Sequence, residues 1–282
     1  MRMVTYREEK YTTPAHTKLF LRIYEADVNA NSVVISHGLG EHGGRYEDIA
    51  RRFVSVGLNV YVPDQRGFGR TSGKRGHVPN FNIFLQDINF VVKMARENSK
   101  KVGLLGHSLG GLIAARYAEE YNDIDILILS SGAFYLDEKT MPKPLFILVK
   151  ILSFFSPSST FSNGLDPRFL SHDEKVVKKY VTDPLVHDKI SAKFVSEMLN
   201  NIKLVHKRAD KIEIPVLIML GTGDKMVEPE GSRQLYKEIE SGKKSIIEYD
   251  GFYHETFNEP KKEIPIKDMV DFLNSHLSWN KE

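Results

Sequence analysis

At residues 101–115 the chain reads KVGLLGHSLGGLIAA, and the other segments can be arranged around this stretch. The apolar run 102–105 is typical of a buried strand, and the small and aliphatic residues after it are typical of a buried helix. Between them lies a Gly-x-Ser-x-Gly turn, in which Gly106 and Gly110 avoid collisions that a Cβ atom would make with the neighbouring strand and helix. A helix N-terminus at this turn directs free N–H groups toward the serine oxygen. The stretch therefore predicts Ser108 as a nucleophile at the end of a strand.

Strand and helix patterns alternate on both sides of this turn. Residues 32–36, 58–62, 124–129, 215–220 and 245–249 are apolar runs that predict strands, and residues 19–25 predict an antiparallel strand near the sheet edge. Helical spacing marks residues 46–56 and 84–95, a segment from about 229, and the stripe from Ile266 to Leu277. This alternation predicts an α/β fold built on a mostly parallel, doubly wound sheet.

The alternation is interrupted between Gly132 and Ile214, where no strand pattern is visible. Residues 142–155 are apolar almost all round, and helical patterns follow at about 172–181 and 188–207. We therefore expect a helical cap at 134–210, inserted between the two parts of the core domain at 1–133 and 211–282.

Composition limits the classes of function. The 282 residues carry a formal net charge of +2 with no block of like charge, so no nucleic-acid partner is expected. The chain has no cysteine, which excludes disulfides and thiolate sites. No metal-ligand spacing, Walker loop or dinucleotide fingerprint appears, so no metal and no cofactor are expected. The first residues lack the apolar region of a signal peptide and no run of 18 apolar residues exists, so a cytoplasmic protein is expected.

A serine hydroxyl needs a histidine base, which is held in place by a carboxylate. In folds with this turn the chain order is serine, acid, histidine, and each partner follows a strand. Asp224 follows the strand 215–220 and His254 follows the strand 245–249, so they are the predicted acid and base. Asp250 is the competing acid. The backbone N–H groups of Leu109 and Leu39 are the predicted donors of an oxyanion hole, because one follows the nucleophile and the other lies in the glycine-rich loop 37–46.

The sequence resembles the monoacylglycerol lipase and lysophospholipase branch of the α/β-hydrolases. The resemblance is carried, in family order, by HGLGEHGGRY at 37–46, DQRGFGRTS at 64–72, GHSLGG at 106–111, YVTDPL at 180–185, GTGD at 221–224 and GFYHE at 251–255. It implies the α/β-hydrolase fold, with a mostly parallel eight-stranded sheet flanked by helices and a helical cap. It also implies the triad Ser108, Asp224 and His254.

The resemblance further implies that the glycerol end of a substrate meets polar groups near Glu41, Arg45 and Tyr180. An ion pair that fixes the loop is the alternative role for Glu41 and Arg45. The family's animal members carry a second histidine three residues after the catalytic one, and this chain has Phe257 there. Recognition of the polar head is therefore expected to differ.

The apolar segment 142–155 suits an acyl chain, and we expect Phe146, Ile147 and Ile151 to contact it. Burial in a lined tunnel stabilises a chain by about 0.8 kcal/mol per methylene. The same surface could rest on a membrane, and packing on the core domain is the plainer alternative. The predicted function is a serine esterase that releases a fatty acid from monoacylglycerol. The alternatives are a lysophospholipase, a short- or medium-chain carboxylesterase, an aminopeptidase, and a lipid-binding module without activity.

Overall fold

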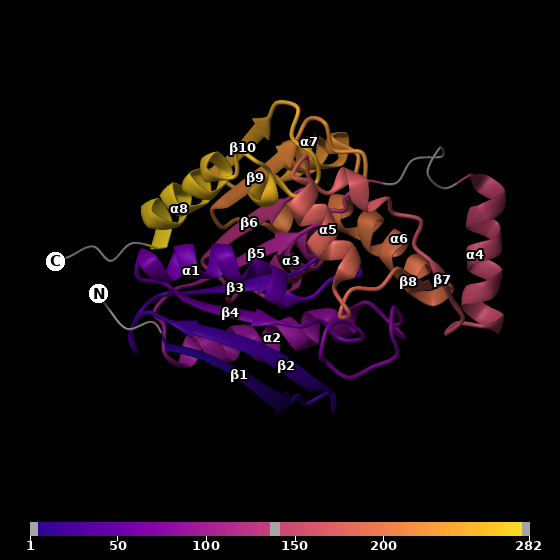
Figure 1. Ribbon diagram of the computed structural model, residues 1–282, viewed down its shortest axis with the longest axis horizontal. Helices are drawn as coiled ribbons and strands as arrows, with labels where there is room; N and C mark the ends of the chain where they lie inside the picture. The colour runs from indigo at the N-terminus through magenta and orange to yellow at the C-terminus, as the bar shows by residue number, and fades with distance from the viewer. Residues whose placement is uncertain (1–4, 136–141, 278–282) are drawn as a thin grey trace.

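The computed structural model describes residues 5–135 and 142–277, and these are built around one eight-stranded sheet (Figure 1). The strand order is β1-β2-β4-β3-β5-β6-β9-β10, in which β1 and β2 are antiparallel to their neighbours and the other pairs are parallel. The mostly parallel eight-stranded sheet that the family resemblance implies is therefore confirmed. The strands are β1 (Thr5–Thr12), β2 (Lys18–Glu25), β3 (Ser32–Ser36), β4 (Asn59–Pro63), β5 (Val102–His107), β6 (Ile126–Ser130), β9 (Val216–Gly221) and β10 (Lys244–Tyr249).

Helices cover both faces of the sheet because its central strands are apolar on both sides. In β3 the side chains of Val33 and Ile35 join one core cluster and that of Val34 joins the other, as the two-residue period of a strand requires. The first cluster lies under α1 (Glu47–Ser55) and α8 (Glu263–Leu277). The second lies under α2 (Asn82–Glu97), α3 (Leu109–Glu120) and α7 (Pro229–Glu238).

A long segment enters between β6 and β9, which pair directly with each other in the sheet. Its elements are α4 (Lys143–Phe155), β7 (Thr160–Ser162), α5 (Glu174–Thr182), β8 (Lys189–Ser191) and α6 (Ala192–Lys207). The helix predicted at 188–207 begins only at Ala192, because the Ser191 side chain accepts the N–H of Phe194 and caps it. The short antiparallel pair β7–β8 has no counterpart in the sequence prediction. Helix α4 lies at the edge of the molecule, away from the sheet (Figure 1).

The division into 1–133, 134–210 and 211–282 stays a prediction, and residues 136–141 next to its first boundary lie outside the described residues. In the described ranges, no helix is both long and apolar enough to cross a bilayer.

The parallel strands bring several loops to one edge of the sheet. The carboxyl ends of β3, β5, β9 and β10 lead into the segments that begin at His37, Ser108, Thr222 and Asp250. Parallel strands end at the same edge, so segments far apart in the sequence meet there.

Candidate active site

Ser108 lies in a strained turn between β5 and α3. Its φ is +55° and its ψ is −120°, a conformation that residues other than glycine rarely adopt. The turn is tight because backbones approach closely: a Cβ on Gly110 would lie 2.0 Å from the Ser36 carbonyl oxygen, and one on Gly106 would lie 2.2 Å from the Gly110 oxygen. The Ser108 side chain consequently stands at the N-terminus of α3.

His254 and Asp224 form a buried pair at the same edge of the sheet. The Nδ1 atom of His254 lies 2.7 Å from Oδ2 of Asp224. The other carboxylate oxygen accepts the backbone N–H groups of Met226, at 2.8 Å, and Val227, at 3.0 Å. Burial of the ring opposes its charged form, but the Asp224 carboxylate outweighs burial and raises the pKa of His254. The pair is therefore fixed in geometry, and the carboxylate stabilises the charged form of the ring.

Asp250, the competing acid, lies elsewhere. Its exposed carboxylate accepts a hydrogen bond from the Thr222 hydroxyl at 3.2 Å, and among the described residues no hydrogen bond joins it to His254. The geometry thus favours Asp224 as the partner of the histidine. Ser108 and His254 line the same cavity, although no hydrogen bond joins their side chains in the described part of the chain. Such a bond is often formed only when substrate is bound.

His107 supports the ring of His254 from the strand side. The two ring centroids lie 4.7 Å apart, and Nδ1 of His107 lies 3.1 Å from the Ser130 carbonyl oxygen. Burial, together with the neighbouring His254, lowers the pKa of His107 to about 4. His107 is therefore neutral near pH 7. Phe257, three residues after His254, is buried against His107 and Tyr46.

Leu39 and Leu109 both line the cavity beside Ser108. Leu109 is the first residue of α3, so its N–H has no acceptor within the helix. Leu39 lies in the loop after β3, and the loop contacts of the described residues include no acceptor for its N–H. The oxyanion-hole role of the two amides stays a prediction, and their place beside Ser108 is compatible with it.

Glu41 and Arg45 do not line this cavity. The Glu41 carboxylate accepts hydrogen bonds from the backbone N–H of Gly38, the Tyr46 hydroxyl and the Arg45 guanidinium. Burial opposes its ionisation, but Arg45 and the nearby histidines lower the pKa of Glu41 to about 2. The structure therefore engages these side chains in the ion pair that the sequence left as the alternative to substrate contact.

Tyr180 lines a separate hollow of about 300 Å³, which shares Asn163, Leu165 and Met226 with the cavity at Ser108. Its ring also lies under the Arg45 guanidinium, 4.7 Å from centroid to carbon. Tyr180 is thus near the cavity without lining it.

The cavity has a volume of about 570 Å³ and is largely apolar. Helix α4 contributes Leu145 and Val149, one helical turn apart, in place of the predicted Phe146, Ile147 and Ile151. Ile147 and Ile151 are 57% and 50% exposed on the other side of the helix, and the Phe146 ring lies under the ammonium groups of Lys150 and Lys203. Sequence reasoning missed the stripe on α6 that completes the wall, although its helical spacing is visible: Val195, Met198 and Ile202.

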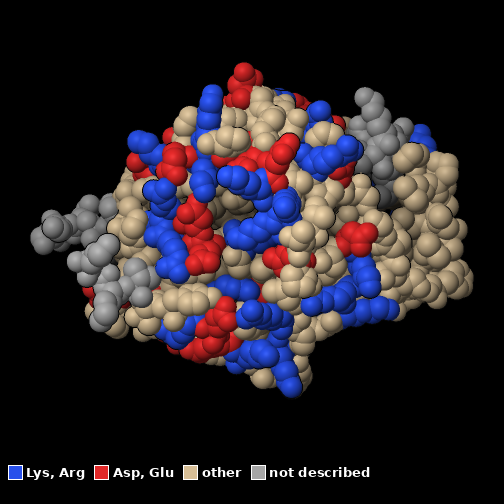
Figure 2. Space-filling view, viewed as in Figure 1, with Lys and Arg blue, Asp and Glu red and all other residues tan. Residues whose placement is uncertain are grey.

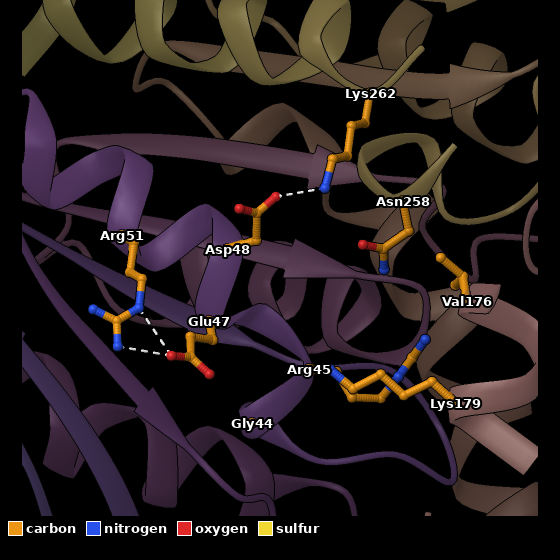
Figure 3. A pocket seen from close by; sticks show the side chains of 9 residues that line it. All are labelled: Gly44, Arg45, Glu47, Asp48, Arg51, Val176, Lys179, Asn258 and Lys262. Carbon is orange, nitrogen blue, oxygen red and sulfur yellow. Dashed lines mark hydrogen bonds and ion pairs between the residues drawn. The ribbon is translucent and has the colours of Figure 1, made fainter. Parts of the chain in front are cut away.

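A second, charged hollow of about 350 Å³ lies outside Arg45, between α1 and α5 (Figure 3). Ion pairs line it, with Arg51 bound to Glu47 and Lys262 bound to Asp48. No three His, Asp or Glu side chains of the described ranges are grouped so that they could hold a metal ion.

The chain is similar to known proteins over most of its length. A family model described as Serine aminopeptidase, S33 (Hydrolase_4) matches residues 28–261. The monoacylglycerol lipase of Mycolicibacterium smegmatis is 31% identical over 278 residues, which cover 97% of this chain and 99% of the lipase. Phospholipase YtpA of Bacillus subtilis is 30% identical over 257 residues, which cover 90% of this chain and 99% of the phospholipase.

The chain is also similar to solved structures. The crystal structure of the monoacylglycerol lipase from Paleococcus ferrophilus superposes with a TM-score of 0.83 at 37% identity, covering 96% of this chain and 99% of that one. With a matching family model over most of the chain and relatives aligned over nearly their whole length, this protein is a serine hydrolase of the α/β-hydrolase family, related to monoacylglycerol lipases and phospholipase YtpA, and a lipase or esterase.

Proposed function

We propose that Ser108, His254 and Asp224 form a catalytic triad that hydrolyses monoacylglycerol to a fatty acid and glycerol. The observation that carries the proposal is the 2.7 Å contact between His254 Nδ1 and Asp224 Oδ2 beside Ser108, at an apolar cavity. The names of the relatives support a glycerolipid substrate.

In the proposed reaction, Ser108 Oγ attacks the ester carbonyl carbon while His254 Nε2 accepts the hydroxyl proton. The N–H groups of Leu39 and Leu109 stabilise the negative oxygen of the tetrahedral intermediate. Collapse breaks the ester bond, and His254 returns the proton to the leaving glycerol oxygen. Water, activated by the same ring, then attacks the acyl-enzyme and releases the fatty acid. Asp224 holds the ring and stabilises its charged form throughout.

The lining of the cavity supports a substrate with a single acyl chain. Leu145 and Val149 of α4, together with the stripe on α6, give the chain an apolar wall next to Ser108. Each methylene that the wall covers contributes about 0.8 kcal/mol, so the cavity selects among chain lengths.

A lysophospholipid is the second candidate substrate. Phospholipase YtpA is a relative of this chain, and Lys225, which lines the cavity, could bind a phosphate. Hydrolysis of monoacylglycerols, lysophospholipids and p-nitrophenyl esters of graded length distinguishes the candidates. The proposal expects the highest kcat/KM on a monoacylglycerol, and a maximum on a lysophospholipid or a short ester would contradict it.

The triad has its own test. Ser108→Ala should abolish hydrolysis of every ester in the panel with no change in thermal unfolding, and a fluorophosphonate should label wild type but not this variant. Retained turnover in Ser108→Ala would rule out the proposed nucleophile.

We further propose that the outer face of α4 contacts a lipid surface. Phe154 and Phe155 are 79% and 78% exposed, and Ile147 and Ile151 lie on the same helix. The edge of the molecule where α4 lies carries almost no charged side chains in Figure 2. An exposed apolar helix of this kind suits the surface in which the substrate dissolves.

A further inference from the structure

Arg45 binds two buried carboxylates that belong to different loops of the active site. Its guanidinium donates to Glu255 through two bonds, Nη1 to Oε1 at 2.5 Å and Nη2 to Oε2 at 2.7 Å. The same Nη1 donates to Oε2 of Glu41. All three side chains are buried, with 8% of Arg45, 4% of Glu41 and 1% of Glu255 exposed. An arginine that makes two parallel bonds to a carboxylate fixes the orientation of that carboxylate as well as attracting its charge.

Each of the two glutamates is tied to one part of the candidate active site. Oε1 of Glu41 accepts the backbone N–H of Gly38 at 2.6 Å, and Gly38 directly precedes Leu39. Glu255 directly follows His254, and its own N–H donates to the Leu170 carbonyl oxygen at 2.8 Å. The chain of contacts therefore runs from the residue before the oxyanion donor, through Arg45, to the residue after the histidine.

We propose that Arg45 is a positioning residue, which fixes the loop carrying the Leu39 N–H relative to His254 by binding Glu41 and Glu255 together. The proposal rests on the triad and oxyanion hole proposed above. Without the guanidinium, two carboxylates would face each other in a buried place, where an unpaired charge is strongly unfavourable. The loops would then move apart or bind protons, and the Leu39 N–H would leave its position.

The charged hollow of Figure 3 makes this proposal testable by chemical rescue. Arg45 lines that hollow, which has a volume of about 350 Å³. Arg45→Ala removes the side chain but leaves an open route by which a guanidinium ion can reach Glu41 and Glu255.

The experiment measures steady-state hydrolysis of a p-nitrophenyl ester by Arg45→Ala with and without millimolar guanidinium chloride. We expect kcat to fall about 10- to 100-fold with KM little changed, because a misplaced donor acts on the transition state. Guanidinium should restore a large part of the lost kcat.

The matched control is Arg116→Ala. Arg116, in α3, is also a buried arginine between two carboxylates, those of Glu119 and Glu120, and it lies outside the cavity. Its removal should lower thermal stability without lowering kcat, and guanidinium should not raise its kcat. Thermal unfolding of both variants separates lost positioning from lost folding.

Unchanged kcat in Arg45→Ala, equal losses of kcat in both variants, or a loss that guanidinium does not restore would overturn the proposal. If Arg45→Ala does not fold, Arg45→Lys replaces it, because one ammonium cannot make the two parallel bonds to Glu255. In that variant a reduced kcat supports the proposal and an unchanged kcat overturns it. Failure of a fluorophosphonate to label wild-type Ser108 would instead contradict the triad itself.

Discussion

Geometry distinguishes Asp224 from Asp250 as the partner of His254, because the two carboxylates are chemically alike. The sequence predicted Asp224 as the acid and left Asp250 as its competitor, since both follow a strand. The structure puts the Asp224 carboxylate on His254 and leaves that of Asp250 exposed on Thr222. Nothing in the one-dimensional pattern could give the direction of either side chain.

The first prediction concerns this aspartate. Asp224→Asn keeps an oxygen for the N–H groups of Met226 and Val227 but removes the charge that stabilises the imidazolium. We expect kcat/KM for a p-nitrophenyl ester to fall about 10³- to 10⁴-fold, as charge loss does in comparable triads. Asp250→Asn is the matched control and should keep wild-type kcat/KM. Similar values for the two variants would mean that Asp224 is not the acid.

At the scale of the element, the turn between β5 and α3 depends on backbone contact. A Cβ on Gly110 would lie 2.0 Å from the Ser36 carbonyl oxygen, and a backbone atom in a central strand cannot move aside cheaply. Gly110→Ala should therefore destabilise the fold by about 1–3 kcal/mol or more, as overpacking does. Gly242→Ala is the control, because nothing lies within 4 Å of its added Cβ. Urea unfolding measures both variants, and equal midpoints would contradict the close contact.

The orientation of helix α4 about its axis could not be predicted from its sequence. Its residues are apolar on nearly every side, so the pattern predicted the helix but not which side faces the cavity. The structure turns Val149 inward and leaves Ile147 and Ile151 outward. The orientation depends on packing against α6, a contact between distant segments.

The outward face gives the third prediction. Phe154→Ser combined with Phe155→Ser should weaken binding to phosphatidylcholine vesicles, since each buried phenylalanine contributes about 1.5–3 kcal/mol. Hydrolysis of a dissolved short-chain ester should stay unchanged, because neither residue lines the cavity. Vesicle sedimentation measures binding, with Val28→Ser as the control for loss of an exposed apolar side chain outside α4. Undiminished binding of the double variant would exclude α4 as the contact.

At the scale of the whole molecule, the sequence predicted the strands and helices that show a clear hydrophobic period. It missed a polar edge strand, two very short strands and the contacts between distant segments. The central strands were readable because both faces are apolar, as in β3 and β5. Strand β1 escaped prediction because it is a largely polar strand at the sheet edge, paired only with β2. Strands β7 and β8 have three residues each, too few to show a period. The Arg45 contacts join segments 210 residues apart, which no local pattern reveals.

The fourth prediction concerns the stability of the whole chain in acid. Burial and His254 lower the pKa of His107 to about 4 from its ordinary value of 6.5, so the unfolded chain binds a proton there more readily than the folded one. The stability that comes from the neutral buried ring is therefore complete above pH 6.5 and is lost as pH falls toward 4. A shift of this size corresponds to about 3 kcal/mol.

His107→Gln cannot titrate, so the free energy of unfolding of wild type, relative to the variant, should fall by that amount between neutral pH and pH 4. Urea titrations at a series of pH values measure the difference, and a constant difference across the series would show that His107 binds protons equally well in the folded and the unfolded chain.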